Sequence, residues 1–400
     1  MATSNVYGNG TNSTAGANTI VHYYDRAGIK AANRVNVYGQ FSDRKSMPRK
    51  MGKTFKISKF LHMYDRTQAD TDFAAKGYMT NRTAASVSAD LTTNVTLAEG
   101  AGAVNKKSLN KVTVEATLAR YGEMIDYTDE VELFSEDTIQ TRYREELGEL
   151  ANSRMEDLQQ LDMLGTGTVI FAGSATSNSE LGSTQADGSD DADSRVSYDL
   201  IRRATRKLMR NRAKKNTSLV SGDVKIDTRT VDKAYYAIIG ADVKADLETI
   251  TRGATYTSEF AYVPSHKYAS ASKLAEGEVG AMHEVRFIES ESAVQYDDGA
   301  VPVADYVGDL ATANVIDSTS VTASDRGNFV VYPILFPTEG AFASVGLKGV
   351  SKVQFHSRSP SKVTNENPYG TTGFFSYNFF YAGLILEEEK LLKLQVCASK

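Results

Sequence analysis

Two segments that alternate polar and apolar residues lie far apart in the sequence and are joined by a long polar stretch. Residues 54–60 and 112–118 show the period of two that is typical of a half-buried strand. Residues 66–108 between them are rich in Ala, Thr and Gly and have only weak periodicity. Because a loop of this kind cannot bury itself, we expect an extended hairpin that leaves the body and lies on another chain.

Residues 1–50 are predicted to form an arm. The first twenty are mostly Gly, Asn, Ser and Thr, a composition typical of disorder. From residue 25 onward the segment becomes basic. We favour a solvated tail that becomes ordered on a neighbouring subunit, and the alternative is an arm close to nucleic acid. The cations are Arg26, Lys30, Arg34, Arg44, Lys45, Arg49 and Lys50.

A long amphipathic helix is predicted after residues 119–134, which we interpret as a strand and a turn. Ser135 can cap it, and apolar residues then recur at three- and four-residue steps as far as Leu164. Gly165 ends the pattern, which gives roughly 30 residues, or about 45 Å. Its charged residues between 142 and 157 are interpreted as a solvated face with pairs at i,i+4.

Residues 173–195 are interpreted as a Ser/Gly/Asp loop and a boundary. Its aspartates, at 187, 190, 191 and 193, do not follow the order of a calcium-binding EF-hand, so a plain acidic loop is favoured. Helices and strands alternate over 197–350. Residues 231–239 and 241–250 look helical, residues 283–290, 329–337 and 341–347 look like strands, and 292–325 is polar and loop-like.

A basic helix is predicted to begin at Ser197 and to run through residues 198–216. Its apolar stripe is Leu200, Ile201, Ala204 and Leu208, and its other face carries Arg202, Arg203, Arg206 and further cations. Such a face could touch nucleic acid. It lacks the interleaved aromatic residues of single-strand binders, and we favour an acidic neighbour as its partner.

The C-terminal part is strongly β-like. Residues 374–386 are aromatic and apolar with few breaks. This pattern indicates a strand buried on both sides, or the core strand of a sheet that faces the long helix. Residues 391–396 predict one more strand.

No residue pattern indicates catalysis, a cofactor or a metal. The chain has 400 residues, one cysteine (Cys397) and five scattered histidines, and it lacks the common nucleophile, zinc and phosphate-loop motifs. It contains no tryptophan but 21 tyrosines and 16 phenylalanines, which suits large buried surfaces, including those between chains. We therefore predict that it is not an enzyme.

Neither a membrane span nor a secretion signal is predicted. No apolar run reaches the ~20 residues of a membrane helix, and the polar N-terminus does not resemble a signal peptide. We expect synthesis in the cytoplasm. A net charge of −5 argues against nucleic-acid binding by bulk electrostatics.

Several segments together resemble a known family. Tyr121, Gly122, Thr128 and Asp129 match the strand that leads into the spine helix of major capsid proteins of Schitoviridae-type podophages and related tailed phages. LAEG at 97–100, with Leu97 and Glu99, is similar to a turn that ends the family's extended loop. GEVGAMHEVRFIES at 277–290 and the terminal strands also agree. The similarity covers residues 50–400, with departures at 65–95, 174–194 and 292–325.

The resemblance implies an α+β, HK97-like fold. Residues 1–50 would be the N-arm, 51–120 the E-loop hairpin, 121–196 the P-domain with its spine helix, 197–350 the A-domain, and 351–400 the return strands of the P-domain.

It also implies self-assembly as the function. Hexamers and pentamers would form the icosahedral shell of a virion around double-stranded DNA, after synthesis in the cytoplasm of a host bacterium. Partners would be the chain itself, a portal, decoration or scaffolding proteins and the packaged DNA, with no membrane. The helix from Tyr143 to Leu161 would act as scaffold. Candidate inter-subunit residues are Phe55, Ile57, Phe60, Leu97, Glu99, Arg202, Arg203 and Arg206.

Other classes remain open at this stage. An encapsulin-type bacterial nanocompartment shares the fold but holds a cargo enzyme, and the long N-arm argues mildly against it. A phage adhesin or decoration protein would be all-β, which the long helix opposes. A carboxylate-based hydrolase is the enzyme alternative, although no spacing supports it.

Overall fold

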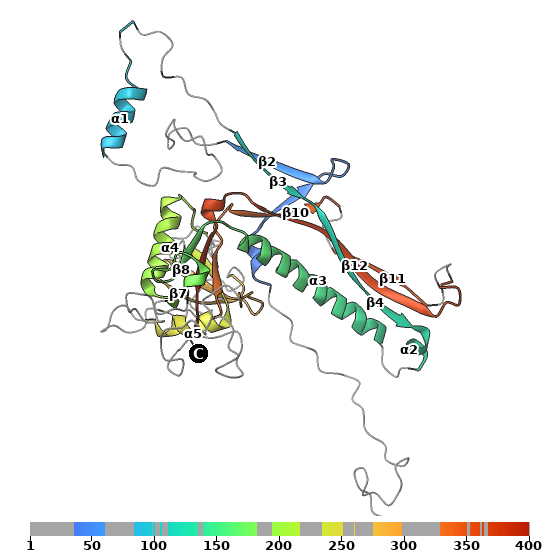
Figure 1. Ribbon diagram of the computed structural model, residues 1–400. Helices are drawn as coiled ribbons and strands as arrows, with labels where there is room; N and C mark the ends of the chain where they lie inside the picture. The colour runs from blue at the N-terminus through green and yellow to red at the C-terminus, as the bar shows by residue number, and fades with distance from the viewer. Residues whose placement is uncertain are drawn as a thin grey trace, which may run out of the picture.

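The computed structural model contains two sheets, a projecting hairpin and one long helix that lies along the first sheet and reaches the second (Figure 1). The described residues are 36–60, 84–97, 99–100, 105, 111–134, 139–181, 194–216, 234–250, 260, 275–297, 329–349, 353–360, 362–363 and 367–399.

The first sheet has five strands and is organised by β12 (Thr372–Ile385), its longest strand. Antiparallel pairing joins β12 to β4 from Thr372↔Thr128 to Tyr381↔Ala119. The opposite edge of β12 pairs first with β11 and then with β10, and β10 pairs in parallel with β1. The bounds are β1 (Asp43–Met47), β4 (Ala119–Thr128), β10 (Phe342–Leu347) and β11 (Gln354–Arg358).

The long helix α3 (Ile139–Leu164) packs on β12 through one row of aromatic residues. Leu147 and Ala151 of the helix are buried in a cluster with this row. Residues of the row alternate along the strand because successive side chains of a strand point to opposite faces. The strand is therefore the core strand that faces the helix, one of the two predicted alternatives. The row consists of Phe375, Tyr377, Phe379 and Tyr381.

The second sheet has six strands in the order β5-β13-β9-β6-β8-β7 and contributes to the largest hydrophobic cluster. Helix α4 (Tyr198–Arg210) buries its predicted apolar stripe in this cluster. The backbone N–H of Leu200 donates to Ser197 Oγ at 3.2 Å, which confirms the predicted cap. The bounds are β5 (Val169–Phe171), β6 (Tyr235–Ile239), β7 (Glu278–Met282), β8 (Val285–Glu289), β9 (Tyr332–Phe336), β13 (Leu392–Val396) and helix α5 (Ala241–Thr249).

The predicted hairpin is present. Strand β2 (Thr54–Phe60) pairs antiparallel with β3 (Lys111–Thr117), and the two project from the body (Figure 1). A helix that was not predicted, α1 (Ala84–Asn94), lies within the excursion between them. The remaining short elements are α2 (Asp129–Phe134), η2 (Tyr38–Phe41), η3 (Asn178–Glu180) and η8 (Glu388–Lys390).

Some sequence predictions are wrong. Residues 235–239 are a strand and not a helix, and all five are buried. A fully buried apolar run carries no amphipathic period, so pattern alone cannot separate the two structures. Residues 129–134 form helix α2 and not a turn, and helix α4 ends at Arg210 rather than near residue 216.

Residues 36–50 are also not a free arm. Val37, Tyr38 and Met47 are buried, and residues 43–47 form strand β1 of the first sheet. The prediction for residues 1–35 lies outside the described residues. So do the cap at Ser135, the acidic loop at 182–193 and the polar segment 298–328.

The predicted domain ranges do not coincide with the two sheets. Strand β5 falls in the range 121–196 and β13 in the range 351–400, yet both belong to the six-stranded sheet. The domain boundaries therefore remain predictions.

A substitution at Gly122 of β4 tests how closely β4 and β12 are packed. A Cβ at this position would lie 2.5 Å from the Tyr377 carbonyl oxygen. We expect Gly122→Ala to lower the free energy of unfolding by about 1–3 kcal/mol, because strands must move to accommodate the methyl group. The matched control is Gly148→Ala in α3, where a Cβ meets nothing within 4 Å. This control should be stabilising by about 0.5–1 kcal/mol. Urea denaturation of both variants measures the difference, and equal effects would contradict the packing described.

Candidate inter-subunit surface

Large exposed apolar side chains gather on the projecting hairpin and its excursion. Phe60 is 64% exposed and Leu97 is 70% exposed, and Met51, Leu91 and Val95 are also exposed. A projecting element that displays several large apolar side chains is a candidate for contact with another chain. Two predicted inter-subunit residues, Phe60 and Leu97, are thus exposed to solvent, and Glu99 beside them is exposed too.

The hairpin presents two different faces. Phe55 and Ile57 lie opposite Ala116 and Val114 on one partly buried face, whereas Phe60 belongs to the other face. At the root, Phe55 packs against a small cluster of the body that consists of Met47, Leu118, Val345 and Ala382. The body therefore holds the root, while the outer part of the hairpin has no core within the described chain.

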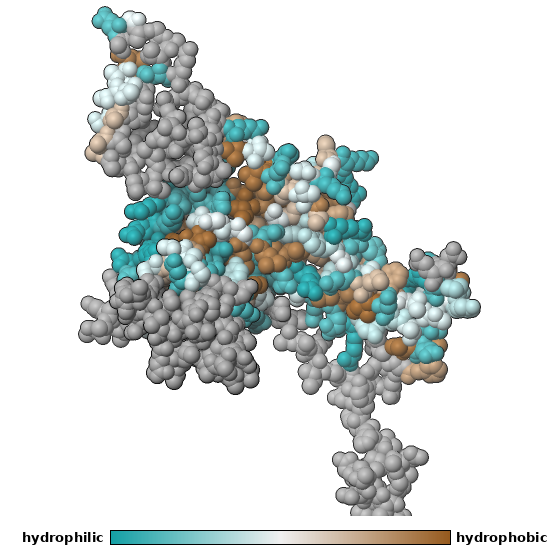
Figure 2. All heavy atoms as spheres, in the orientation of Figure 1, coloured by the Kyte–Doolittle hydropathy of each residue, from teal (hydrophilic) through white to brown (hydrophobic). Residues whose placement is uncertain are grey.

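A second exposed apolar surface lies on α2, which follows β4. Leu133 is 73% exposed and Phe134 is 84% exposed, with Val131 beside them. In Figure 2, brown and tan spheres gather at the end of the molecule where Figure 1 places α2. This surface was not predicted from the sequence, although three of the last four residues of DEVELF are apolar.

The family-motif residues lie along the seam of β4 and β12 and around the start of α2. The Tyr121 ring stacks on Phe379 with centroids 5.7 Å apart, and Gly122 faces the β12 backbone. Thr128 pairs with Thr372, and the Asp129 N–H donates to the Thr371 carbonyl at 2.9 Å. These residues position α2 at the end of the sheet.

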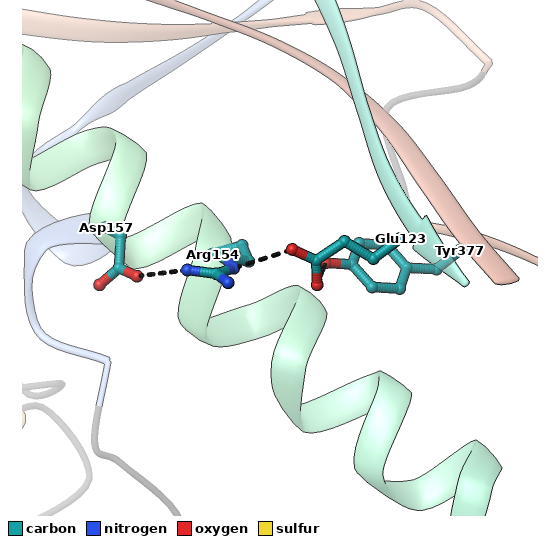
Figure 3. A network of polar contacts seen from close by, with 4 residues as sticks. All are labelled: Glu123, Arg154, Asp157 and Tyr377. Atoms are coloured by element: carbon teal, nitrogen blue, oxygen red, sulfur yellow. Dashed lines mark hydrogen bonds and ion pairs between the residues drawn. The ribbon is translucent and has the colours of Figure 1, made fainter. Parts of the chain in front are cut away.

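A polar network joins α3 to both strands of this seam (Figure 3). Arg154 Nε donates to Glu123 Oε1 at 3.1 Å, and the Tyr377 hydroxyl donates to Glu123 Oε2 at 3.0 Å. Arg154 also lies 3.8 Å from the Asp157 carboxylate. Burial and the Glu123 carboxylate raise the pKa of Tyr377 to about 12, so its hydroxyl stays a donor at neutral pH. The network lines a groove of about 660 Å³.

Glu156 joins α3 to the segment that precedes β1. Its side chain is buried, although sequence analysis placed it on a solvated face. The carboxylate accepts the Tyr38 backbone N–H at 2.7 Å and also that of Val37. Burial raises the pKa of this carboxyl above its usual value, and the backbone donors offset only part of the shift.

Lys393 joins α3 to the six-stranded sheet. Its ammonium donates to the Leu164 carbonyl at 2.9 Å, at the C-terminal end of the helix where a cation is favoured. Burial lowers the pKa of Lys393 below its usual value. Together, Glu156 and Lys393 fix the spine helix relative to elements far away in the sequence.

The remaining candidates, Arg202, Arg203 and Arg206, lie on the exposed face of α4. They belong to the six-stranded part of the molecule, whereas the hairpin and α2 are next to the five-stranded sheet (Figure 1). The predicted inter-subunit residues thus form separate surfaces and not one site.

Within the described part of the chain, no three His, Cys, Asp or Glu side chains come together as a possible metal site. Over the same residues, no helix combines the length and the apolar character that crossing a membrane requires.

Comparison with known proteins gives one similar protein in sequence and several similar folds among solved structures. No protein-family model matches the chain. It is 27% identical over 405 aligned residues to the "Major capsid protein" of Pseudomonas phage KPP21. The aligned region covers 97% of this chain and 95% of that protein.

Solved structures show the fold. The capsid of Ralstonia phage GP4 matches with a TM-score of 0.57 at 10% identity, covering 98% of this chain and 99% of that one. The acidic stable capsid structure of Helicobacter pylori bacteriophage KHP30 matches with a TM-score of 0.51 at 9% identity, covering 99% and 100%. The chain therefore has the predicted α+β, HK97-like fold.

Glu156→Gln tests the buried carboxylate. Because the pKa of Glu156 is raised in the folded chain, the stability linked to its proton is present below the ordinary glutamate pKa of about 4.3 and is lost as the pH rises through the raised value. Glutamine keeps an acceptor oxygen but does not titrate. We therefore expect the variant to gain stability relative to the wild type as the pH rises above about 4.

Urea denaturation across this pH range measures that difference. Glu145→Gln, which removes an exposed carboxylate from the same helix, is the control. A difference between wild type and Glu156→Gln that stays constant with pH would contradict the assignment.

Proposed function

We propose that the chain is the major capsid protein of a tailed bacteriophage and that it assembles with copies of itself into the shell of the virion. The observation that carries this proposal is the hairpin, which displays exposed aromatic and aliphatic side chains on a body whose own core is complete. The HK97-like fold and the similarity to the KPP21 protein over nearly the whole chain support it.

Assembly follows from burial of these surfaces on neighbouring subunits. Each large apolar side chain that leaves water contributes about 1.5–3 kcal/mol. The cost of associating and ordering the chains removes much of this gain, so one contact is weak. In a closed shell every subunit makes the same contacts with its neighbours. The sum of many weak contacts then stabilises the shell.

Finer aspects of the proposal concern geometry and partners. We propose hexamers and pentamers in an icosahedral lattice, with double-stranded DNA inside and a portal and scaffolding or decoration proteins as partners. Phe55, Ile57, Phe60, Leu97 and Glu99 would contact neighbouring subunits through the hairpin. Assembly needs no catalytic group, so we propose that the chain has no enzymatic activity.

The encapsulin-type nanocompartment is the alternative function. The name of the KPP21 relative favours a phage shell over this alternative. Electron microscopy of the purified protein should show closed shells. The content of particles made during infection separates the two functions. A phage shell should yield double-stranded DNA on extraction, whereas a nanocompartment would contain a cargo enzyme instead.

Deleting residues 66–95 tests the role of the hairpin. The deletion keeps β2, β3 and both sheets, so we expect a folded chain with a normal circular dichroism spectrum. It should fail to form closed shells because most of the excursion, with the exposed Leu91 and Val95, is removed from the surface that we propose lies on the neighbour. Normal particles in electron micrographs would show that the hairpin assignment is wrong.

Leu133→Ser with Phe134→Ser tests the surface on α2. Both side chains are largely exposed, so the free energy of unfolding should change by no more than about 0.5 kcal/mol per site. We expect fewer closed shells at a given protein concentration, measured by sedimentation. The matched control, Leu133→Met with Phe134→Leu, keeps the surface apolar and should assemble normally. Equal assembly of both double variants would exclude α2 from the interface.

A further inference from the structure

Helix α4 carries a continuous basic stripe on its exposed face. Its cations are spaced by three and four residues, which places them on one side of a helix of 3.6 residues per turn. The opposite side is buried in the largest core cluster. Hydrophilic side chains gather in Figure 2 where Figure 1 places α4. We define the α4 basic stripe as Arg202, Arg203, Arg206, Lys207 and Arg210, all of them exposed.

Most of this charge is not compensated within the described chain. Arg202 pairs with Asp199 at 3.2 Å, and Arg203 donates to the Gly173 carbonyl at 3.1 Å. Asp199 is the one acidic residue of the helix. Arg206, Lys207 and Arg210 have no acidic partner among the described residues. A cluster of cations without compensating acidic residues favours a partner with a high density of negative charge.

The face also lacks what a protein partner requires. Interfaces between proteins have an apolar core surrounded by a polar rim. The exposed side of α4 offers only Met209 as a large apolar side chain, and it is 45% exposed. A phosphate backbone needs no such core, because release of counterions drives its binding. Sequence analysis favoured an acidic protein neighbour, and the missing apolar core reverses this preference.

Double-stranded nucleic acid fits better than single strands. Single-strand binders stack bases on exposed aromatic rings. The aromatic residue of α4, Tyr198, is already engaged, with His283 at its edge and the Arg202 guanidinium over its face. From Arg202 to Arg210 the stripe extends about 12 Å along the helix axis. Duplex DNA carries one negative charge per about 1.7 Å, so several phosphates face a stripe of this length.

We infer that the α4 basic stripe binds the phosphate backbone of double-stranded DNA on the inner side of the shell. The inference rests on the proposed function and specifies where the packaged DNA is contacted. Contacts of this kind carry no base specificity, which suits a surface that must accept any sequence.

The test replaces Arg206, Lys207 and Arg210 by glutamine in the full chain. Glutamine is a good helix former and the positions are exposed, so the fold should persist. Binding of purified subunits to a fluorescent duplex is followed by anisotropy over a range of salt concentrations. Loss of three phosphate contacts should make the slope of log affinity against log salt shallower by roughly 2–3.

Two control variants keep this result interpretable. Lys53→Gln, Lys348→Gln and Lys362→Gln together change the net charge equally at exposed positions outside α4 and should retain the wild-type slope. Arg206→Lys with Arg210→Lys keeps the charge of the stripe and should retain it as well. A glutamine variant with the wild-type slope would overturn the inference. Loss of shells with unchanged DNA binding would also overturn it, in favour of a protein contact.

The side of the shell is tested separately on closed particles. Lys207 should be protected there from an amine-reactive polyethylene glycol that modifies it in free subunits. Modification at equal rates would place the stripe outside and overturn the inference. Absence of shells from the wild-type protein would instead contradict the proposed function, and the salt dependence of subunit binding would still report on the stripe.

Discussion

The packing of α3 against β12 is the contact on which the rest of the structure depends. The aromatic row of β12 meets Leu147 and Ala151 of the helix, and close packing there leaves little freedom to shift either element. Because β12 also pairs with β4, β10 and β11, the register of the whole five-stranded sheet follows from its position. The hairpin root and α2 are both continuations of this sheet.

Buried polar groups then determine how other segments attach to α3. Glu156 holds the backbone at Val37 and Tyr38, and Lys393 holds the end of the helix to the second sheet. Burying each charge costs desolvation energy, so such groups are weak contributors to stability. Their partners are backbone groups, whose positions are fixed by the fold. These hydrogen bonds therefore define one position of α3 relative to the segment before β1 and to the six-stranded sheet.

The surfaces left open differ in chemistry. The hairpin and α2 are apolar and suit contact with another protein chain, whereas α4 is basic and lacks an apolar core. A rigid body with separate surfaces of this kind can contact several neighbours and a polyanion at the same time.

Periodic patterns in the sequence predicted the elements that bury one side only. Strands β2 and β3 have a period of two, α4 has a 3.6-residue stripe and a serine cap, and α3 has a long apolar repeat. Exposure of the α4 cations followed from the same kind of pattern. Three-dimensional contacts were needed to show that residues 235–239 are a strand, that Glu156 is buried and that β13 joins the second sheet. A periodic pattern arises when one side of an element is buried and the other is solvated. It therefore cannot identify an element that is covered on both sides, or a polar face that is covered by a segment distant in the sequence.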